Sequence, residues 1–301
     1  MLKPASLLPL ALSSVLLFSA CNPDEAEQNA PQELGAISWP SVQSALSCLA
    51  ESGPIISAHR GRDLKSKRFA DNSLEGLRAL RKSGFIMAEI DVAQLKDGTL
   101  ILYHDGIWDE HSTGRGAVAA SSWAQAEKIL LKTKRGDITA SHLPKFTEVL
   151  DWAGGQFYFE IDFKSSADEV AVITAINVAG MTKNVVLISY NQKQAARLRR
   201  AGRKITGGDM MVAVSTRSVR DFKALKAGPS LAWTGTKGLN ETLISQLNAQ
   251  SIPAAYGMMS PKYATPANYS ALSVIVTDYA REAKQKAGLR QSGVSRLRAC
   301  K

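Results

Sequence analysis

The sequence predicts a (β/α)₈ barrel, preceded by an export signal and a short tether. Short apolar runs with strand character alternate with amphipathic helical stretches over most of the 301 residues, and this alternation favours a parallel sheet with crossover helices. An α/β barrel uses about 250 residues as one domain, which suits this length. Ionisable residues follow several of the apolar runs, and a barrel places its active site at such strand ends. An open doubly wound sheet is the alternative architecture.

The composition excludes several other classes of protein. Apolar residues make up 45% and charged residues 21% of the chain, with 22 glycines, 11 prolines and no repeat, which excludes collagen, solenoids and wholesale disorder. Three cysteines are too few for a disulfide-built scaffold, and none has zinc-ribbon spacing. No basic patch interleaved with aromatic residues suggests nucleic acid as a partner, and no Gly-rich loop suggests a nucleotide.

Residues 1–20 have the features of an export signal. Lys3 precedes an apolar run from Leu7 to Phe18, which is too short to span a bilayer because a span needs roughly 20 residues. The run ends at Ser19-Ala20-Cys21 and resembles the lipobox of bacterial lipoproteins. Cleavage there would leave Cys21 as a lipid-modified first residue, anchoring the protein to a membrane of the bacterial cell envelope. An ordinary secretory signal cut at the same place is the alternative.

The mature chain is expected to have a tether, a domain and one disulfide. Residues 21–40 are polar and acidic without periodicity, as in a flexible tether, and the barrel domain is expected over 41–301. Export would place Cys48 and Cys300 in an oxidising compartment. Because the first and last elements of a closed barrel are neighbours, these two cysteines are predicted to form a disulfide. Two unrelated thiols are the alternative.

The strands are predicted from short apolar runs, and the helices from longer amphipathic stretches between them. The predicted strands are Ile55–Ala58, Phe85–Val92, Leu100–His104, Phe157–Phe163, Val185–Ser189, Met210–Val214, Leu231–Thr234, Ile252–Tyr256 and Val274–Thr277. The predicted helices are Ser73–Ser83, Ser122–Leu131, Phe146–Ala153, Ala167–Ala179, Gln192–Ala201, Val219–Ala227 and Glu241–Gln250. These strands exceed the eight of a barrel by one, so one is wrong or lies outside it, and Met210–Val214 is the first candidate to be dropped.

Four successive predicted strands end in ionisable groups. These are His59, then Glu89 and Asp91, then His104 and Asp105, and finally Asp162 and Lys164. Because the strands of a barrel all end at one mouth, we expect these side chains to converge there.

The carboxylates among them point to a metal ion. Glu89 and Asp91 are two residues apart on one strand, so they share a face at roughly 7 Å, and Glu160 and Asp162 share a face with Lys164 in the same way. Inward carboxylates at that distance repel by about 2.4 kcal/mol per pair at an effective dielectric constant near 20. A divalent cation would neutralise them, and oxygen ligands favour Mg²⁺ or Ca²⁺. The alternative is a surface strand whose carboxylates face water.

Two of the four histidines follow predicted strands. Cleavage of a phosphodiester needs a proton removed from the nucleophile and another given to the leaving oxygen, and His59 and His104 could supply both functions. His111 and His142 lie in loop-like sequence, and we interpret both as structural or solvent-exposed.

Basic residues near these histidines suit an anionic substrate. Arg60 directly follows His59 and could bind a phosphate through two hydrogen bonds, and Lys164 adds a second cation. The basic runs Arg197–Lys204 and Lys284–Lys301 have two readings, as contacts to anionic lipid or as solvated helix faces.

An ordered set of motifs resembles the glycerophosphodiester phosphodiesterase family. The set consists of HRG at His59–Gly61, Asn72-Ser73, E-x-D-V at Glu89–Val92, Asp97-Gly98, His104-Asp105, LPKFTEVL at Leu143–Leu150, VLISYN and VIVTDY. The resemblance implies a metal-dependent barrel hydrolase that cleaves glycerophosphodiesters to glycerol 3-phosphate and an alcohol.

The resemblance also implies roles for individual residues. His59 and His104 would be the acid–base pair, Arg60 a phosphate contact, and Glu89 and Asp91 metal ligands. For the third ligand, the family's E-x-K pattern fits Asp162-Phe163-Lys164, a form with Asp that is also seen in the related sphingomyelinase D enzymes. A shift of two residues would instead choose Glu160.

Two departures from the family pattern leave the substrate open. Asp71 stands where the family has another acid, and IPAAYGMM replaces a tryptophan-containing motif of the seventh strand. Three functions therefore remain: hydrolysis of glycerophosphodiesters or lysolipids, sphingomyelinase D-like or phospholipase action on intact lipids, and binding of a phosphorylated ligand by an inactive lipoprotein. The retained histidines, carboxylates and Lys164 argue against the third.

Overall fold

The computed structural model describes residues 39–259 and 269–300. The predicted export signal, the lipidation of Cys21 and the tether up to residue 38 lie outside the described residues. None of the helices in the described part of the chain is long and apolar enough to cross a bilayer.

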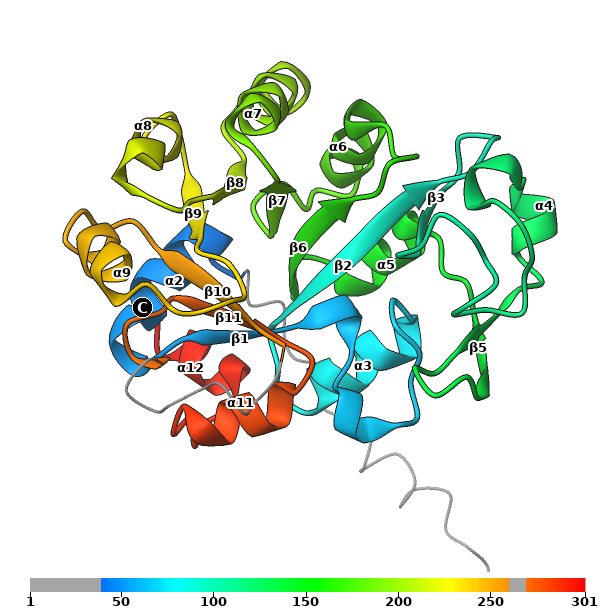
Figure 1. Ribbon diagram of the computed structural model, residues 1–301, viewed down its shortest axis with the longest axis horizontal. Coiled ribbons are helices and arrows are strands. Elements are labelled where there is room, and N and C mark those ends of the chain that lie inside the picture. The colour runs from blue at the N-terminus through cyan, green and yellow to red at the C-terminus, as the bar shows by residue number, and fades with distance from the viewer. Residues whose placement is uncertain (1–38, 260–268, 301) are drawn as a thin grey trace, which may run out of the picture. The chain divides into compact units, whose positions relative to one another are not determined.

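Parallel strands close into a barrel, which confirms the predicted fold class (Figure 1). Its strands are β1 (Ile55–Ala58), β2 (Met87–Gln94), β6 (Tyr158–Phe163), β7 (Val185–Ser189), β8 (Met211–Ser215), β9 (Ser230–Trp233), β10 (Ala254–Met258) and β11 (Val274–Thr277). They pair in the order β1-β11-β10-β9-β8-β7-β6-β2, and β2 closes the ring by pairing in parallel with β1.

Helices cover the outside of the barrel, as Figure 1 shows for α6, α7 and α8. The helices are α2 (Val42–Leu49), α3 (Leu74–Lys82), α4 (Trp123–Ala126), α5 (Phe146–Ala153), α6 (Glu169–Val178), α7 (Gln192–Thr206), α8 (Phe222–Leu225), α9 (Glu241–Asn248), α11 (Ala280–Lys286) and α12 (Gly293–Arg298). Several of these helices have a side-chain cap at their amino-terminal end. The Ser73 side chain accepts from the Gly76 amide at α3, and the Asn191 side chain accepts from the Gln194 amide at α7. Such caps satisfy amides that a helix leaves free at its start.

The predicted third strand was wrong as a barrel strand. The strand β3 (Leu100–Leu102) pairs antiparallel with β2, with Val92 opposite Leu102 and Gln94 opposite Leu100. The chain reverses through a turn in which Gly98 has a φ of 86°, so β2 and β3 form a hairpin. A parallel neighbour would need a crossover of a dozen or more residues, and this connection is too short for one. The Met210 segment, by contrast, is the barrel strand β8.

A second segment differs from the sequence prediction. The helix predicted at Ser122–Leu131 is limited to α4, because the chain then enters β4 (Leu130–Lys132), which pairs antiparallel with β5 (Ile138–His142). The helix predicted at Val219–Ala227 is a 3₁₀ turn followed by α8. The helices α2, α11 and α12 were not predicted.

Inward side chains of the barrel form layers. The lowest layer is apolar, with Met87 of β2 and Tyr158 of β6 packed together with α2 residues such as Leu46. The same strands carry acids above it, because Glu89 is opposite Glu160 and Asp91 is opposite Asp162 in the parallel register. Successive inward positions on one strand are two residues apart, so the barrel interior changes from apolar to acidic towards the carboxyl ends of its strands.

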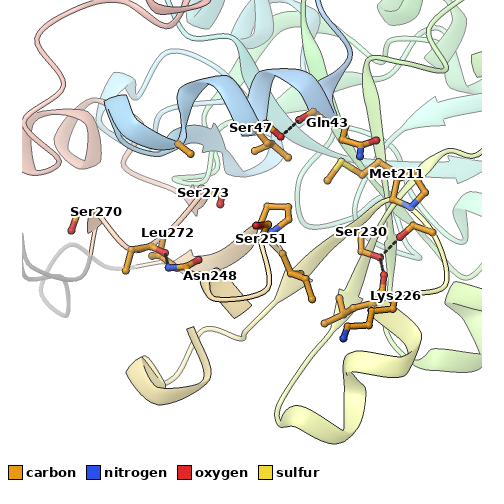
Figure 2. A pocket seen from close by; sticks show the side chains of 18 residues that line it. Gln43, Ser47, Met211, Lys226, Ser230, Asn248, Ser251, Ser270, Leu272 and Ser273 are labelled. Carbon is orange, nitrogen blue, oxygen red and sulfur yellow. Dashed lines mark hydrogen bonds between the residues drawn. The ribbon is translucent and has the colours of Figure 1, made fainter. Parts of the chain in front are cut away.

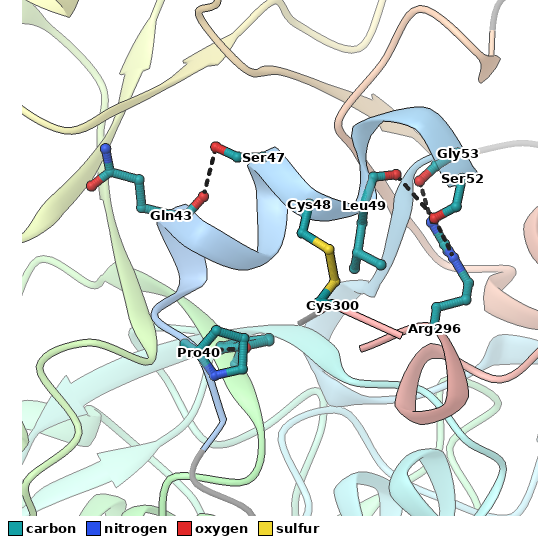
Figure 3. Close-up of a disulfide and its surroundings, with 10 residues drawn as sticks. Pro40, Gln43, Ser47, Cys48, Leu49, Ser52, Gly53, Arg296 and Cys300 are labelled. Carbon is teal, nitrogen blue, oxygen red and sulfur yellow. Dashed lines mark hydrogen bonds between the residues drawn. A yellow bond between two sulfur atoms is a disulfide. The ribbon is translucent and has the colours of Figure 1, made fainter. Parts of the chain in front are cut away.

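A disulfide joins Cys48 of α2 to Cys300, which follows α12 (Figure 3). The two Cα atoms are 5.8 Å apart and the cysteines are 252 residues apart in sequence. Beside it, the buried Arg296 donates from Nη1 to the Pro54 carbonyl at 2.9 Å and from Nε to Ser52 Oγ at 3.2 Å. The end of the chain is therefore tied to the segment that enters β1.

Three arginines of the two basic runs are held by protein partners. Arg199 is buried and donates to Ser230 Oγ at 2.6 Å, and Arg203 pairs with Asp209 at 2.5 Å. Arg296, described above, is buried as well. These side chains hold elements together and do not form a continuous basic surface.

Candidate active site

Three buried carboxylates meet inside the barrel near the ends of β2 and β6. Glu89, Asp91 and Asp162 each offer an oxygen, and these oxygens lie within 4.8 Å of one another. Their exposed fractions are 5%, 1% and 6%. Glu160, which is opposite Glu89 and precedes Asp162 by two residues on β6, accepts a hydrogen bond from Ser57 Oγ at 2.5 Å. The geometry therefore groups Asp162, and not Glu160, with the carboxylates of β2.

The concentration of negative charge perturbs these acids. Burial, together with the negative charge of Asp91, raises the pKa of Glu89 well above its ordinary value. Burial also raises the pKa of Glu160 to about 7, against the opposing hydrogen bond from Ser57. Both effects arise because a low-dielectric interior disfavours charged acids. The cluster consequently favours a neutralising cation.

Lys164 and Tyr190 contact the cluster from the end of β6 and from the loop after β7. Lys164 Nζ lies 2.6 Å from Asp91 Oδ1 and 2.7 Å from Asp162 Oδ2. The Tyr190 hydroxyl donates to both carboxylate oxygens of Asp162, at 2.7 and 2.8 Å. Burial and the nearby charge of Asp162 raise the pKa of Tyr190 above its ordinary value, so the hydroxyl stays a donor. These contacts fix the direction of the Asp162 carboxylate.

The carboxylate set fits a hard divalent cation. Its donors are all oxygens, which suits Mg²⁺ or Ca²⁺ better than zinc, and it is buried enough to exclude most water. The Glu89, Asp91 and Asp162 side chains would be the ligands. Lys164 forms ion pairs with two of them, Asp91 and Asp162.

A sharp turn after β1 brings the backbone to this cluster. Arg60 has a φ of 53°, and its amide donates to Glu89 Oε2 at 2.8 Å. Gly61 follows with a φ of 67°, and a Cβ there would meet Leu77 Cδ2 at 2.9 Å. The HRG motif therefore needs its glycine for space as well as for conformation.

Asn72 fixes the side chain of Asp91 through two hydrogen bonds. Its Nδ2 donates to Asp91 Oδ2 at 2.7 Å, and its Oδ1 accepts from the Asp91 amide at 3.0 Å. Like Arg60, Asn72 has a positive φ, 57°, which asparagine tolerates better than most residues. It is a positioning residue that the motif contained but that was not among the predicted site residues.

His59 is oriented by the last barrel strand. Its Nδ1 lies 2.9 Å from Oδ1 of Asp278, the residue after β11, and its Nε2 lies 3.9 Å from Glu89 Oε2. Burial alone would raise the pKa of Asp278, but the hydrogen bond from His59 and the positive charges around it hold that pKa below its ordinary value. An anionic Asp278 thus fixes the ring with Nε2 towards the carboxylates.

His104 is oriented by the residue beside it. Its Nδ1 lies 2.6 Å from Asp105 Oδ1, and its Nε2 lies 2.8 Å from Arg60 Nη2. A guanidinium can only donate, so Nε2 holds a lone pair and the proton of the neutral ring is on Nδ1. This is the tautomer in which Nε2 can accept a proton.

Two arginines share one buried acid at the edge of the site. Asp71 accepts from Arg60 Nη1 at 3.1 Å and pairs with Nε of the buried Arg62. Burial would lower the pKa of Arg60, but the charges of Asp91 and Asp71 outweigh burial and raise it. Asp71 thus holds the guanidinium of Arg60 beside His104.

The structure brings most of the predicted site residues together. His59, Arg60, Glu89, Asp91, His104, Asp162 and Lys164 are linked to the same cluster by the contacts above. The predicted reading of His142 agrees with its exposed position on β5. For His111 the structural option fits, because its Nδ1 lies 2.6 Å from Asp105 Oδ2, next to the pair formed by Asp105 and His104.

Besides Asn72, three further contact residues were missed, although a sequence signal existed for two of them. Asp278 directly follows the predicted strand Val274–Thr277, and Tyr190 directly follows Val185–Ser189, so the strand-end argument applied to every strand would have included both. Nothing in the spacing of His111 indicates its contact with Asp105.

A cavity of about 760 Å³ lies elsewhere, near the amino-terminal ends of the strands (Figure 2). Its lining includes Gln43 and Ser47 of α2 and the first residues of β8 and β9, Met211 and Ser230. None of the predicted site residues within the described ranges lines it. The chemical groups described above therefore lie at the other end of the barrel.

The sequence is similar to those of glycerophosphodiester phosphodiesterases. A sequence model of the glycerophosphoryl diester phosphodiesterase family matches residues 59–224. A glycerophosphodiester phosphodiesterase from Caldanaerobacter subterraneus is 27% identical over 144 residues, which cover 46% of this chain and 58% of that protein. The matched region thus spans little more than half the length of this relative.

Solved structures agree on the fold. A glycerophosphoryl diester phosphodiesterase from Parabacteroides distasonis has a TM-score of 0.70 at 19% identity, covering 83% of this chain and 93% of that one. A phosphodiesterase from Oleispira antarctica, solved in complex with the product sn-glycerol-3-phosphate, has a TM-score of 0.64 at 16% identity and covers 79% of this chain and 99% of that one.

Proposed function

Because this chain belongs to the glycerophosphoryl diester phosphodiesterase family, we propose that it hydrolyses glycerophosphodiesters to glycerol 3-phosphate and an alcohol. The observation that carries the proposal is the pair of imidazoles at one carboxylate cluster. Each ring has its Nδ1 on an aspartate, so the lone pair of each neutral ring is on Nε2, where that of His104 accepts from Arg60 Nη2. The named product in the Oleispira complex supports the same substrate class.

The two histidines account for both proton transfers. In hydrolysis, a bond forms between water and phosphorus while the bond from phosphorus to the alcohol oxygen breaks. One imidazole takes the proton that the attacking water loses, and the protonated form of the other gives a proton to the departing alkoxide. His59 lies beside Glu89, whereas His104 lies beside Arg60, so the two rings approach the cluster from different elements.

Arg60 and Lys164 supply the contacts to the phosphate. Arg60 Nε has no hydrogen-bond partner among the described residues and is buried, and its Nη2 faces His104. A planar guanidinium suits two oxygens of a phosphodiester. Lys164 adds a positive charge beside Asp91 and Asp162. Both cations would hold the anionic centre next to the imidazoles.

Glu89, Asp91 and Asp162 would hold one divalent cation. Bound there, the cation would neutralise charge on the phosphoryl oxygens. The protein supplies the fixed ligand directions, through Asn72 on Asp91, Tyr190 on Asp162 and the Arg60 amide on Glu89.

The test is hydrolysis of glycerophosphocholine, glycerophosphoethanolamine and an intact phospholipid, followed by assay of the released alcohol from all three and of glycerol 3-phosphate from the first two. We expect release from the first two, loss of activity with EDTA, and loss in His59→Ala. The matched control is His142→Ala, which changes a histidine of β5 and should retain activity. Turnover unaffected by both EDTA and His59→Ala would contradict the assigned roles, and turnover of the intact lipid alone would contradict the substrate class.

We also propose that the protein is exported and held to a membrane by lipid on Cys21. The lipobox-like Ser19-Ala20-Cys21 supports this, and so does a disulfide between Cys48 and Cys300, since disulfides persist in oxidising compartments. Labelling with a radioactive fatty acid should mark the wild-type protein and not Cys21→Ser. Equal labelling of both would contradict the anchor.

A further inference from the structure

We propose that His111 is a positioning residue for His104, acting through the carboxylate of Asp105 that both imidazoles share. The inference rests on the proposed function for its catalytic consequence, but its geometry stands on contacts alone. His104 Nδ1 lies 2.6 Å from one oxygen of Asp105, and His111 Nδ1 lies 2.6 Å from the other. Asp105 is thus bridged between two imidazoles, of which only His104 faces the carboxylate cluster.

The donors and acceptors of this bridge are determined by Arg60. Because Arg60 Nη2 can only donate to His104 Nε2, the proton of neutral His104 must be on Nδ1, and Asp105 accepts a hydrogen bond from it. Its second oxygen then needs a donor of its own, and His111 Nδ1 is that donor. Without His111, the carboxylate could rotate and withdraw the oxygen that holds the His104 ring.

The backbone at His111 is held in place by its own segment and by β4. The His111 carbonyl accepts from the Lys132 amide at 2.8 Å, and the Thr113 amide donates to the Leu130 carbonyl at 2.9 Å. Next to it, Ser112 Oγ donates to the Trp108 carbonyl at 2.6 Å. The side chain of His111 is 25% exposed, so the ring is fixed at one edge and reached by solvent at the other.

The charged and titratable groups around His111 are few. Asp105 faces it directly, and the exposed Glu110 places a carboxylate oxygen within 4.8 Å. Tyr103 of the loop after β3 lies against its backbone, and Lys132 of β4 approaches the same loop with Nζ 3.5 Å from the Asp109 carbonyl. Burial would raise the pKa of Asp105, but its hydrogen bonds with His104 and His111 lower it.

A shared carboxylate couples the two protons. When both rings are protonated, two cations compete for one anion, so protonation of His111 opposes protonation of His104. His111 therefore sets how strongly Asp105 supports the cationic form of His104, which is the form that donates a proton. It does this without touching the substrate.

The first test is independent of activity. The protein has only four histidines, so ¹⁵N NMR can follow each imidazole through a pH titration, with assignment by single substitutions. We expect His104 in the Nδ1–H tautomer, and its resonances should respond to the titration of His111. In His111→Asn, an amide that donates but does not titrate, the His104 resonances should lose the part of their response that follows His111. Superimposable His104 curves in the two proteins would overturn the inference.

The second test is kinetic. His111→Ala should lower kcat about tenfold with KM within about twofold, because His111 acts through Asp105 and not on the substrate. His111→Asn should recover most of kcat at neutral pH while the acid limb of the pH profile stays shifted. The matched controls His142→Ala and His142→Asn should leave both parameters unchanged. A loss in His111→Ala that His111→Asn does not recover, or an unchanged acid limb, would count against the inference.

Failure of the two ideas can be told apart. If the wild-type protein hydrolysed no glycerophosphodiester, the proposed function would be wrong, whereas the NMR coupling through Asp105 would still support the bridge. If hydrolysis were found but the two rings titrated independently, only the role of His111 would be lost.

Discussion

Asp278 Oδ1 lies 2.9 Å from His59 Nδ1, although 219 residues separate them. They meet because β1 and β11 are paired neighbours in the barrel, with Ala58 opposite Thr277. Each residue directly follows its strand, so closure of the barrel itself places the carboxylate on the imidazole. Fold and acid–base geometry are therefore linked at this seam.

Replacing this carboxylate should disable His59 without unfolding the protein. Asp278→Asn keeps the size of the side chain but allows the amide to donate to Nδ1, which favours the wrong tautomer. We expect kcat to fall by about 10²–10⁴-fold with a small change in KM. Steady-state kinetics would show this, with the exposed Asp209→Asn as a control that should behave as wild type. Activity within a few-fold of wild type would contradict the orienting role.

Metal binding should distinguish the two acids of β6. Asp162→Asn removes a proposed ligand that lies beside Glu89 and Asp91, so it should abolish the rise in melting temperature that we expect Mg²⁺ or Ca²⁺ to give the wild type. Glu160→Gln changes the acid two residues earlier on β6, which accepts from Ser57, and this variant should keep the rise in melting temperature. The reverse pattern in thermal melts would identify Glu160 as the ligand instead.

Breaking the disulfide should lower stability but leave chemistry intact. A loop of this length has an entropic ceiling of roughly 5 kcal/mol, and measured values are often lower. For Cys48→Ser with Cys300→Ser we expect a fall in melting temperature of about 5–15 °C and an unchanged kcat at 25 °C, because the bond lies at the opposite end of the barrel from the carboxylates. Intact-mass measurement with and without reductant checks that the wild type holds the bond.

Asp71 should make stability depend on pH. Hydrogen bonds and charge from Arg62 and Arg60 outweigh burial and lower the pKa of Asp71 below its ordinary 3.8. Its stabilisation is therefore present above that value and is lost as the pH falls through the lower folded-state pKa. Asp71→Asn should cost about 3–5 kcal/mol at pH 7, since it leaves two arginines without their acid.

The control for this effect is an ion pair at the surface. Asp209 and Arg203 are about half exposed, so Asp209→Asn should change the free energy of unfolding by less than about 1 kcal/mol. Urea unfolding at pH 7 and pH 3 would compare the variants. If the free energy of unfolding of Asp71→Asn were lower than that of the wild type by the same amount at both pH values, Asp71 would not be the titrating group.

Local sequence patterns predicted much of the barrel and part of its site. Apolar runs located β1, β7 and β11 to within a residue or less, since a buried parallel strand is apolar along its whole length. The polar residue after such a run identified His59 at the mouth. Because alternate residues of a strand point to the same face, the sequence also predicted that Asp91 of β2 and Asp162 of β6 both point into the barrel.

What sequence could not supply depends on contacts between distant residues. An apolar run does not indicate the direction of its strand relative to its neighbours. The run Leu100–His104 was therefore predicted as a parallel strand, whereas it pairs antiparallel with β2 in a hairpin. The helix α2 closes the amino-terminal end of the barrel, a role that its eight residues alone do not reveal. The contact between His111 and Asp105 depends on a loop conformation fixed by β4, which no periodicity encodes.

The hairpin strand β3 has a consequence for how the site could fail. His59 is oriented by the barrel seam, but His104, Asp105 and His111 all belong to the excursion between β2 and β6, outside the ring of strands. Opening of that excursion would remove one proposed proton-transfer group together with its orienting partners, while the proposed cation ligands and the other imidazole stayed assembled. Ligand affinity and turnover would then be lost separately on heating, with turnover first.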